Sequence, residues 1–205
     1  MEPGFVIVLS GPSGVGKGTV NAGLSARHPD IVQSVSMTTR AQRAGEENGK
    51  DYFFVTPEEF ISQRDQGALL EWAEYVHNYY GTPKRFVEDH VAAGHIVMLE
   101  IETQGAMQLK QTLQNGVFIF LVPPHFDELA ERIRGRGAET DTQISERIER
   151  ARQELTQIGS YEYVVVNDKV EEAVDHVEAI LLAERRKVVR NVGLQQRFAP
   201  QNTSE

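Results

Sequence analysis

The stretch Gly11-Pro12-Ser13-Gly14-Val15-Gly16-Lys17 follows the apolar run Phe5 to Leu9 and opens into a helix-compatible segment, Thr19 to Arg27. Its glycines let the backbone turn so that successive N–H groups converge on an anion, and the helix N-terminus adds partial positive charge. Lys17 supplies a mobile full charge for terminal phosphates. Because the spacing Gly-x4-Gly-Lys stands between a strand and a helix, the sequence predicts a P-loop that binds a nucleoside triphosphate.

The residues predicted to cradle this triphosphate are contiguous. They are Gly11, Pro12, Ser13, Gly14, Val15, Gly16, Lys17, Gly18 and Thr19. Gly18 departs from the general pattern, because many P-loops carry there the Ser or Thr whose hydroxyl binds magnesium. Thr19 or water must serve instead.

The composition of the chain argues against membrane proteins, nucleic-acid-binding proteins and disulfide-bonded proteins. The chain has 205 residues, 40% of them hydrophobic, no cysteine and a net charge of −9. No apolar run approaches the roughly 20 residues of a membrane span, and the N-terminus lacks the features of a signal peptide, so we expect a soluble cytosolic protein without a membrane partner. The acidic balance argues against nucleic acid as a partner, while zero cysteines exclude disulfides and thiolate-bound metals. Oligomeric state stays open.

Apolar strand-like runs alternate with helical patterns along the chain. Helices are predicted over Thr103 to Gln114 and Val170 to Arg190, and the predicted strands are Phe5 to Ser10, Ile96 to Ile101, Val117 to Val122 and Tyr163 to Val166. Near-continuous apolar strands separated by helices are typical of a buried parallel sheet. The predicted fold class is therefore α/β, a P-loop NTPase-type three-layer αβα arrangement around a parallel central sheet.

Two segments interrupt the alternation and are predicted to handle substrate. Residues 37–90 form an insertion, with strands at Tyr52 to Val55 and Leu69 to Val76 and helices that start at two Thr-Pro pairs. Residues 123–159 form a helical lid, in which Gly135-Arg136-Gly137 marks a flexible joint. The core then comprises residues 1–36, 91–122 and 160–190, followed by a polar tail, residues 191–205, that we expect to be disordered.

Charged residues in these segments suit phosphoryl transfer, which needs phosphates placed in line and their charge neutralised. Arginines cluster on both sides of the P-loop, and arginine binds phosphate in bidentate fashion. Surface ion pairs are the alternative for Arg134, Arg150 and Arg152. Glu100 and Glu102 are predicted to share one strand face at its carboxyl end, where Glu100 could hold magnesium through water; a pair of exposed acids is the alternative.

A family resemblance rests on ordered motifs between about residues 5 and 190. Besides the P-loop they are Ser34-Val35-Ser36-Met37-Thr38-Thr39-Arg40, Arg43-Ala44-Gly45-Glu46, Gly49-Lys50-Asp51-Tyr52, Glu71-Trp72-Ala73-Glu74-Tyr75, Asn78-Tyr79-Tyr80-Gly81, Arg132 through Gly137 and Val164 through Asp168. The chain resembles guanylate kinase. The resemblance implies magnesium-dependent transfer of the γ-phosphoryl group from ATP to GMP, and to dGMP, in the cytosol.

The resemblance also implies a role for individual residues toward GMP. The phosphate of GMP would be held by Ser36, Arg40, Arg43, Tyr52 and Tyr80. Guanine would be read by Glu71, Thr82 and Glu102, and carboxylates suit guanine because its N1–H and N2–H2 groups are donors. The family often has Ser at position 82 and Asp at position 102, so the two residues here alter the reach of those groups.

Toward ATP, the resemblance assigns the donor phosphates and the transferring group to Lys17, Arg132, Arg136 and Arg147. Asn167 and Asp168 would lie near adenine. The catalytic set is thus Lys17, Arg40, Arg136 and Arg147. A kinase for AMP, dTMP or UMP is the nearest rival, and a non-catalytic guanylate-kinase-like scaffold module is a rival of another class.

Overall fold

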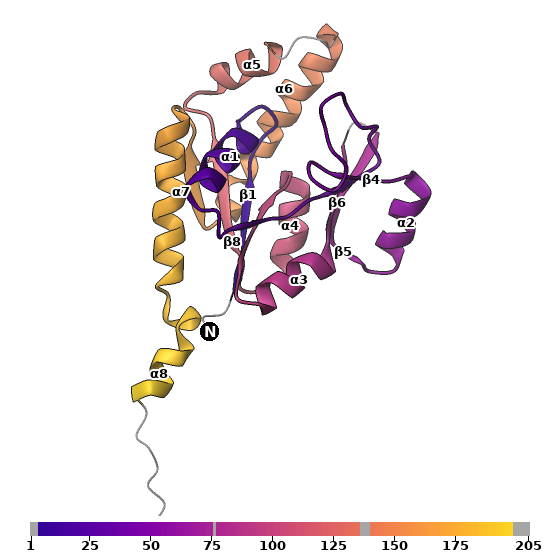
Figure 1. Ribbon diagram of the computed structural model, residues 1–205. Helices are drawn as coiled ribbons and strands as arrows, with labels where there is room; N and C mark the ends of the chain where they lie inside the picture. Colours follow the sequence, from indigo (N-terminus) through magenta and orange to yellow (C-terminus); the bar gives the residue numbers. More distant parts are fainter. Residues whose placement is uncertain (1–3, 76, 136–139, 199–205) are drawn as a thin grey trace, which may run out of the picture.

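A computed structural model describes residues 4–75, 77–135 and 140–198. Its central sheet has the strand order β2-β7-β1-β8-β9, and all neighbours pair in parallel (Figure 1). The strands are β1 (Phe5–Ser10), β2 (Val32–Gln33), β7 (Ile96–Glu100), β8 (Val117–Val122) and β9 (Tyr163–Val166). This confirms the predicted parallel sheet; β2 was not predicted, because two residues carry no periodicity.

Helices cover the sheet and build the insertions. They are α1 (Lys17–Arg27), α2 (Pro57–Asp65), α3 (Lys84–Ala92), α4 (Thr103–Thr112), α5 (Phe126–Arg134), α6 (Asp141–Leu155), α7 (Val170–Arg185) and α8 (Val192–Phe198), with short 3-10 helices η1 (Thr156–Ser160) and η2 (Val188–Arg190). No helix within the described ranges is long and apolar enough to cross a membrane.

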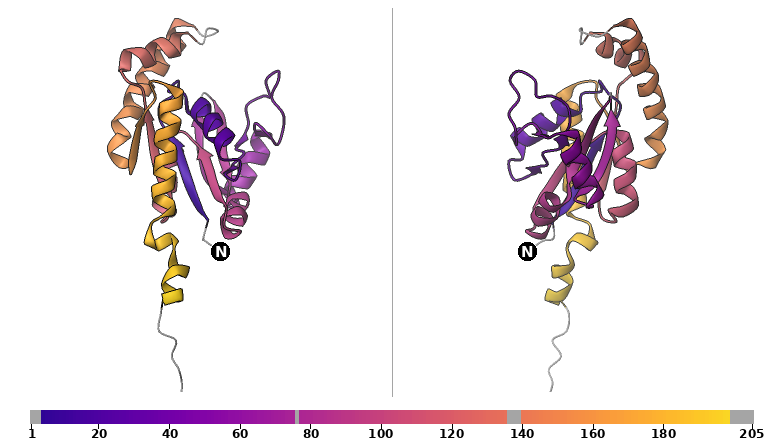
Figure 2. Two further views of the ribbon diagram at one scale, coloured as in Figure 1. Left: turned by 60° about the vertical axis from the view of Figure 1, so that its left-hand side comes forward. Right: turned by 90° about the vertical axis from the view of Figure 1, so that its right-hand side faces the viewer.

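Side chains of β1 alternate between two hydrophobic cores. Ile7 and Leu9 pack in the core that contains residues of α1 and α7. Val6 and Val8 point to the other face and pack in the core that contains residues of α3 and α4. All four are fully buried or nearly so, and each such side chain contributes roughly 1.5–3 kcal/mol of burial free energy. The sheet therefore lies between two helical layers, as predicted (Figure 2).

The first insertion contains a second sheet with the order β4-β3-β6-β5. Its strands are β3 (Met37–Thr38), β4 (Phe53–Phe54), β5 (Leu69–Tyr75) and β6 (Asn78–Pro83). The sequence did not predict β3 or β6, and it assigned Thr82 to the start of a helix. Instead α3 begins at Lys84, and the hydroxyl of Thr82 bonds to a buried carboxylate rather than capping a helix.

The second insertion consists of α5, α6 and η1. Thr140 caps α6 together with Gln143, each side chain bonding to the backbone of the other. Figure 2 shows α5 at one end of the molecule and α6 running from that end toward the sheet, where Ala151 packs in the core that contains residues of α1 and α7. The joint predicted at Gly135-Arg136-Gly137 lies partly outside the described residues. The division of the chain into core, insertion and lid stays a prediction.

The C-terminal segment differs from expectation in two respects. The helix predicted over Val170 to Arg190 ends at Arg185, and α8 occupies residues that we expected to be disordered; residues 199–205 of the predicted tail lie outside the described part. Asn191 explains the break, because its side-chain amide donates to the carbonyls of Arg185 and Lys187 at 2.8 and 2.9 Å. These bonds satisfy the free end of α7 and let the chain start α8.

Arg190 and a buried acid at this end of the chain serve structure. Glu184 is 1% exposed, and its carboxylate accepts from the Tyr163 hydroxyl at 2.5 Å and from Arg190 at 3.0 Å. The Arg190 guanidinium also lies 4.0 Å from the centre of the Phe5 ring. The cluster ties the end of α7 to the start of β1.

We expect Glu184→Gln to lower the free energy of unfolding by about 3 kcal/mol, because it leaves the buried Arg190 charge without its partner. Urea denaturation measures the loss. Glu88→Gln is the matched control, since Glu88 belongs to an exposed pair with Lys84 on α3 and its loss should cost less than about 1 kcal/mol. Equal losses in the two variants would contradict the structural role of Glu184.

Candidate active site

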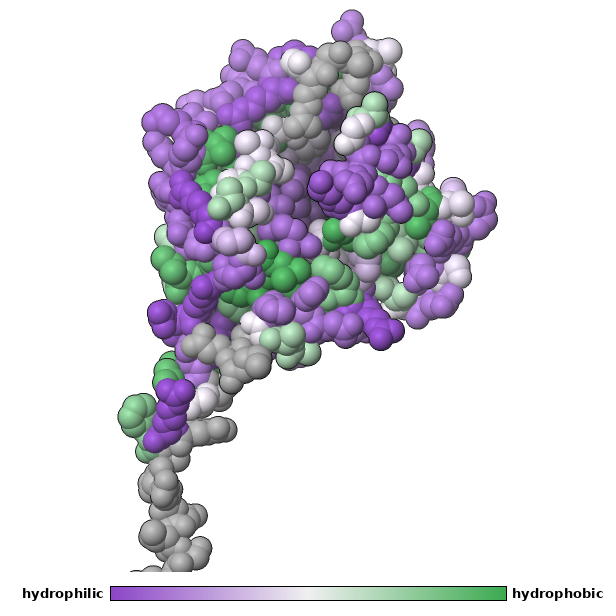
Figure 3. All heavy atoms as spheres, viewed as in Figure 1, coloured by the Kyte–Doolittle hydropathy of each residue, from purple (hydrophilic) through white to green (hydrophobic). Residues whose placement is uncertain are grey.

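The predicted site residues gather at the carboxyl end of the central sheet. The P-loop follows β1, Glu102 follows β7, and Asn167 follows β9. In open α/β sheets this edge forms the ligand crevice. In Figure 3 the surface is hollowed between the core and the first insertion, and hydrophilic residues line the hollow.

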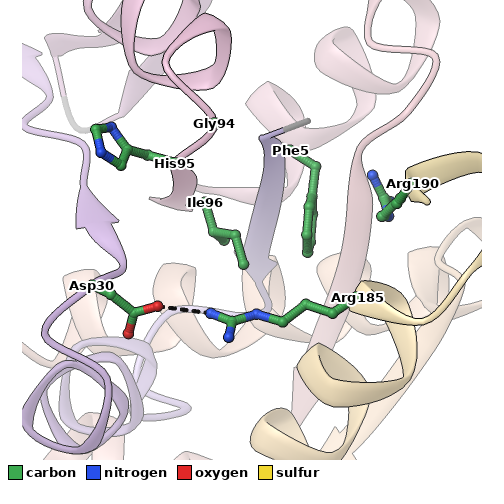
Figure 4. Close-up of a pocket in the computed structure, with 7 residues that line it drawn as sticks. All are labelled: Phe5, Asp30, Gly94, His95, Ile96, Arg185 and Arg190. Carbon is green, nitrogen blue, oxygen red and sulfur yellow. Dashed lines mark hydrogen bonds and ion pairs between the residues drawn. The ribbon is translucent and has the colours of Figure 1, made fainter. Parts of the chain in front are cut away.

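A separate cavity of about 240 Å³ lies at the opposite end of the sheet, where β1 and β7 begin (Figure 4). None of its lining residues is a predicted site residue. They are Phe5, Asp30, Gly94, His95, Ile96, Arg185 and Arg190. Its three charged side chains are already paired, because Arg185 pairs with Asp30 at 2.9 Å and Arg190 pairs with Glu184.

The P-loop has the geometry that its glycines predict. Gly16 has φ of 98°, and a Cβ on it would lie 2.5 Å from the side-chain nitrogen of Asn167. Lys17 is only 8% exposed, and its ammonium donates to the carbonyl of Gly11 at 2.7 Å. The same ammonium lies 3.4 Å from Oε1 of Glu102. The charged end of Lys17 is thus held inside the loop, beside an acid that follows the neighbouring strand β7.

Asn167 fastens the P-loop to the sheet. Its side-chain amide donates to the carbonyl of Val15 at 2.7 Å, and its backbone N–H donates to Val122 at 2.8 Å. Its carbonyl accepts two N–H groups of Arg132, both at 3.2 Å. Asn167, predicted near adenine, therefore lies beneath the loop, whereas Asp168 is exposed.

Ser13 is a junction between three parts of the chain. Its backbone N–H donates to Glu154 at 3.2 Å, and its hydroxyl accepts from Arg147 at 3.0 Å. The hydroxyl of Tyr75, from the first insertion, lies 3.4 Å from the same oxygen. The structure therefore brings the predicted Arg147 to the P-loop; Arg136 lies outside the described residues. Glu154 and Tyr75 were missed because sequence gives no signal for such long-range contacts.

Arg40 is the centre of the group of residues that the sequence predicts to hold the phosphate of GMP. Glu46 pairs with Arg40 through two bonds of 2.7 and 3.0 Å and raises the pKa of the guanidinium. The guanidinium also lies 5.3 Å from the ring centre of Tyr52, which in turn lies 6.1 Å from the ring of Tyr80. Burial raises the pKa of the Tyr52 hydroxyl. Three predicted residues are thus together, and Glu46, quoted only as part of a motif, orients the arginine.

Two further predicted residues lie on the segments that flank this group. The backbone N–H of Arg43 donates to Glu46 at 2.8 Å, and its side chain is exposed. Ser36 precedes β3, and its carbonyl accepts from the backbone N–H of Phe53 at 2.8 Å.

Glu71 and Thr82 form a buried pair across the hairpin β5–β6. The Thr82 hydroxyl donates to Oε1 of Glu71 at 2.6 Å, and the two residues are 1% and 6% exposed. Burial raises the pKa of Glu71 to about 7, and the nearby charge of Glu102 acts in the same direction. The carboxyl group can therefore change its protonation state near neutral pH.

Gly105 provides the space for that carboxyl group, and sequence reasoning missed it. A Cβ on Gly105 would lie 2.1 Å from Oε2 of Glu71. Gly105 stands in the first turn of α4, where glycine costs about 1 kcal/mol relative to alanine. A glycine inside a predicted helix was the available signal, because such a position usually has a packing reason.

The prediction that Glu100 and Glu102 share a strand is wrong, because β7 ends at Glu100 and Glu102 is the N-cap of α4. Both acids still face the P-loop. Glu100 accepts from the Asn21 side chain at 3.3 Å, lies beside Gly18, and has a pKa raised by desolvation. Within the described part of the chain, Oε2 of Glu102 is buried without a hydrogen-bond partner, which leaves an acceptor for a ligand.

Comparisons with known proteins agree on one family. A family model described as guanylate kinase matches residues 4–184. Guanylate kinase from Oceanobacillus iheyensis is 51% identical over 186 residues, which are 91% of this chain and 90% of that protein. Guanylate kinase from Streptococcus thermophilus is 50% identical over 193 residues, 94% of this chain and 92% of that protein. The crystal structure of guanylate kinase from Anaplasma phagocytophilum matches with a TM-score of 0.80 at 37% identity and covers 98% of both chains.

The pKa of Glu71 predicts a pH-dependent stability without nucleotide. Because it rises from 4.5 in the unfolded chain to about 7 in the folded protein, the folded state binds the proton more tightly and stability falls as pH increases between these values. Glu71→Gln removes this effect, so its stability relative to the unmodified protein should rise by about 3 kcal/mol from pH 4.5 to pH 8.

Urea denaturation across this pH range checks the prediction. Glu74→Gln is the matched control, because Glu74 stands exposed on the same strand. A stability difference between Glu71→Gln and the unmodified protein that does not change with pH would show that folding does not raise the pKa of Glu71.

Proposed function

Because this chain belongs to the guanylate kinase family and transfers phosphoryl groups from ATP to GMP, we propose that the P-loop edge holds ATP and that the first insertion presents GMP to it. The observation that carries this proposal is the buried Glu71–Thr82 pair, because Glu102, which pairs with Lys17, is near enough for its charge to help raise the pKa of Glu71. The site thus collects hydrogen-bond acceptors for a base beside cations for phosphates. This combination supports a nucleotide acceptor that carries guanine.

Guanine recognition follows from the acceptor set. Guanine presents N1–H and N2–H2 donors, whereas adenine presents an acceptor at N1 and no amino group at C2. Ionised Glu71 and Glu102 accept from guanine and leave adenine with unpaired groups, which buried sites reject strongly. Since the pKa of Glu71 is about 7, GMP that binds to the protonated enzyme displaces a proton from this carboxyl group. Thr82 orients the carboxylate for that contact.

The GMP phosphate is assigned to Arg40, Arg43, Tyr52, Tyr80 and Ser36. The support is the cluster of the Arg40 guanidinium with two tyrosine rings. Arg40 stays charged at every working pH and binds phosphate in bidentate fashion, as it binds Glu46 now. The phosphate would therefore exchange with Glu46 or share the guanidinium with it.

Transfer of the phosphoryl group then needs charge neutralisation rather than covalent help. Lys17 would neutralise the donor phosphates from inside the P-loop, while Arg132, Arg136 and Arg147 would reach them from the second insertion. Arg147 already lies 3.0 Å from Ser13, which supports its assignment. Closure of both insertions over the nucleotides would exclude water, which would otherwise accept the phosphoryl group.

The residues fit a magnesium ion held mainly by substrate. The described residues contain no group of three or more metal-ligating side chains, and Mg²⁺ commonly uses one or two carboxylates together with phosphates and water. Glu100 fits that role, because its carboxylate faces the start of α1 beside Gly18. When bound, the ion neutralises charge on the donor phosphates. Glu100 would orient its water ligands.

Several finer points rest on the sequence and belong to this proposal. They are activity on dGMP, a role in purine nucleotide metabolism and GMP salvage, cytosolic location, and the division into core (1–36, 91–122 and 160–190), GMP-binding insertion (37–90) and lid (123–159). Scaffold modules share the fold, but the curated relatives compared above are guanylate kinases that are 50–51% identical to this chain over more than 90% of its length. The intact P-loop with a buried Lys17 supports catalysis over scaffolding.

A coupled assay of ADP formation tests the substrate. With ATP and magnesium we expect rapid turnover of GMP and dGMP, and at least about 10⁴-fold lower kcat/KM for AMP, UMP and dTMP. Preference for another base would keep the P-loop chemistry and discard the roles of Glu71, Thr82 and Glu102. Binding of GMP without any turnover would favour the scaffold module.

Lys17→Ala tests the P-loop assignment. We expect kcat to fall at least about 100-fold, because the developing charge on the transferred group loses its closest cation, while the Kd for GMP changes less than about threefold. Single-turnover kinetics and calorimetric titration with GMP measure the two effects. Lys84→Ala is the control, since Lys84 is an exposed residue of α3, and turnover that survives in Lys17→Ala would reject the assignment.

A further inference from the structure

Strand β5 is an edge strand of the second sheet, and one side chain of the core satisfies its free edge. The backbone N–H of Trp72 donates to Oε1 of Gln108 at 3.2 Å, and the side-chain amide of Gln108 donates to the carbonyl of Trp72 at 2.8 Å. A single carboxamide thus makes both bonds that a neighbouring strand would make. Gln108 lies on α4, which belongs to the core, so these bonds join the insertion to the core.

Glu71, the residue before Trp72 on β5, is the one that needs positioning. The ladder between β5 and β6 shifts register between Leu69 and Trp72, so Glu71 lies in an irregular part of the strand. Such an irregularity re-aims a side chain but leaves the local ladder disrupted. Besides its bond to Thr82 on β6, Glu71 therefore depends on contacts outside its own sheet.

Helix α4 supplies those contacts on one face. Gly105 makes room for Oε2 of Glu71, and Gln108, almost one turn later, holds the backbone of Trp72. Glu102, the N-cap of the same helix, carries the second acid of the proposed guanine site. The helix thus sets the distance between an acid of the insertion and an acid of the core.

We propose that Gln108 is a positioning residue for guanine: through its two bonds to Trp72 it fixes Glu71 relative to Glu102, and so determines selectivity for the GMP base. The inference rests on the proposed function, in which both acids read guanine. Gln108 itself does not touch the nucleotide. Its loss should therefore affect GMP and leave the ATP site unchanged.

Gln108→Leu removes both bonds with little change in volume. We expect the KM for GMP to rise about tenfold, the KM for ATP and the kcat at saturating GMP to change less than about twofold, and the preference for GMP over AMP to fall. Gln111→Leu is the matched control, because it makes the same substitution at an exposed position of the same helix. Its kinetic constants should equal those of the unmodified protein.

A double-mutant cycle tests whether Gln108 acts through Glu71. In the Glu71→Gln background, Gln108→Leu should change the KM for GMP by less than about threefold, because the group that it positions is already altered. Multiplication of the two single effects would overturn the proposal, as would equal increases in the KM for GMP and ATP. A Gln108→Leu enzyme with an unchanged KM for GMP would overturn it too.

The variants also distinguish failure of the positioning role of Gln108 from failure of the proposed role of Glu71. If Gln108→Leu is too unstable to assay, Gln108→Glu replaces it under the same criteria, since it keeps the acceptor for the Trp72 N–H and loses the donor to its carbonyl. If Glu71→Gln itself leaves the KM for GMP unchanged, the proposed role of Glu71 fails, whatever Gln108 does. An increase in Glu71→Gln with normal kinetics in Gln108→Leu rejects only the positioning role.

Discussion

The catalytic residues at the carboxyl end of the central sheet depend on Asn167. Its side-chain amide and its backbone N–H each donate a hydrogen bond, and its carbonyl accepts from Arg132. This residue joins the end of β8, the P-loop and Arg132 of the second insertion. A P-loop works only if its N–H groups are fixed before the phosphates arrive, because preorganised dipoles cost no reorganisation during reaction. A side chain at position 16 would collide with Asn167, so this contact requires glycine in the loop. The glycine pattern of the P-loop therefore depends on an asparagine far away in the sequence.

The sequence predicted those features that repeat within a short window. The apolar runs Phe5 to Ser10 and Val117 to Val122 coincide with β1 and β8, because burial of a strand on both faces leaves a continuous apolar run. Strands β2 and β3, with two residues each, leave no such pattern. The helix predicted to start at Thr82 begins at Lys84 instead, because a Thr-Pro pair carries the same local signal whether the hydroxyl caps a helix or meets a carboxylate from another strand.

The candidate site could be assembled from motifs, but its energetics could not. Family motifs named Glu71, Thr82 and Glu102 separately, whereas the burial that raises the pKa of Glu71 depends on β5, β6 and α4 meeting in space. Gly105 was visible only as an unexplained glycine in a helix. Gln108 gave no signal at all, since a glutamine on a helix surface is ordinary and its partner is a backbone group 36 residues away.

The way in which α4 covers β5 also bears on how the chain avoids self-association. An open strand edge presents unpaired N–H and C=O groups on which another chain can add a strand. At Trp72, Gln108 hydrogen-bonds both the N–H and the C=O group, so another chain cannot pair with the edge of the insertion at that residue. The contact that aligns the base-reading acids thus also shields the insertion against β-sheet aggregation in a crowded cell.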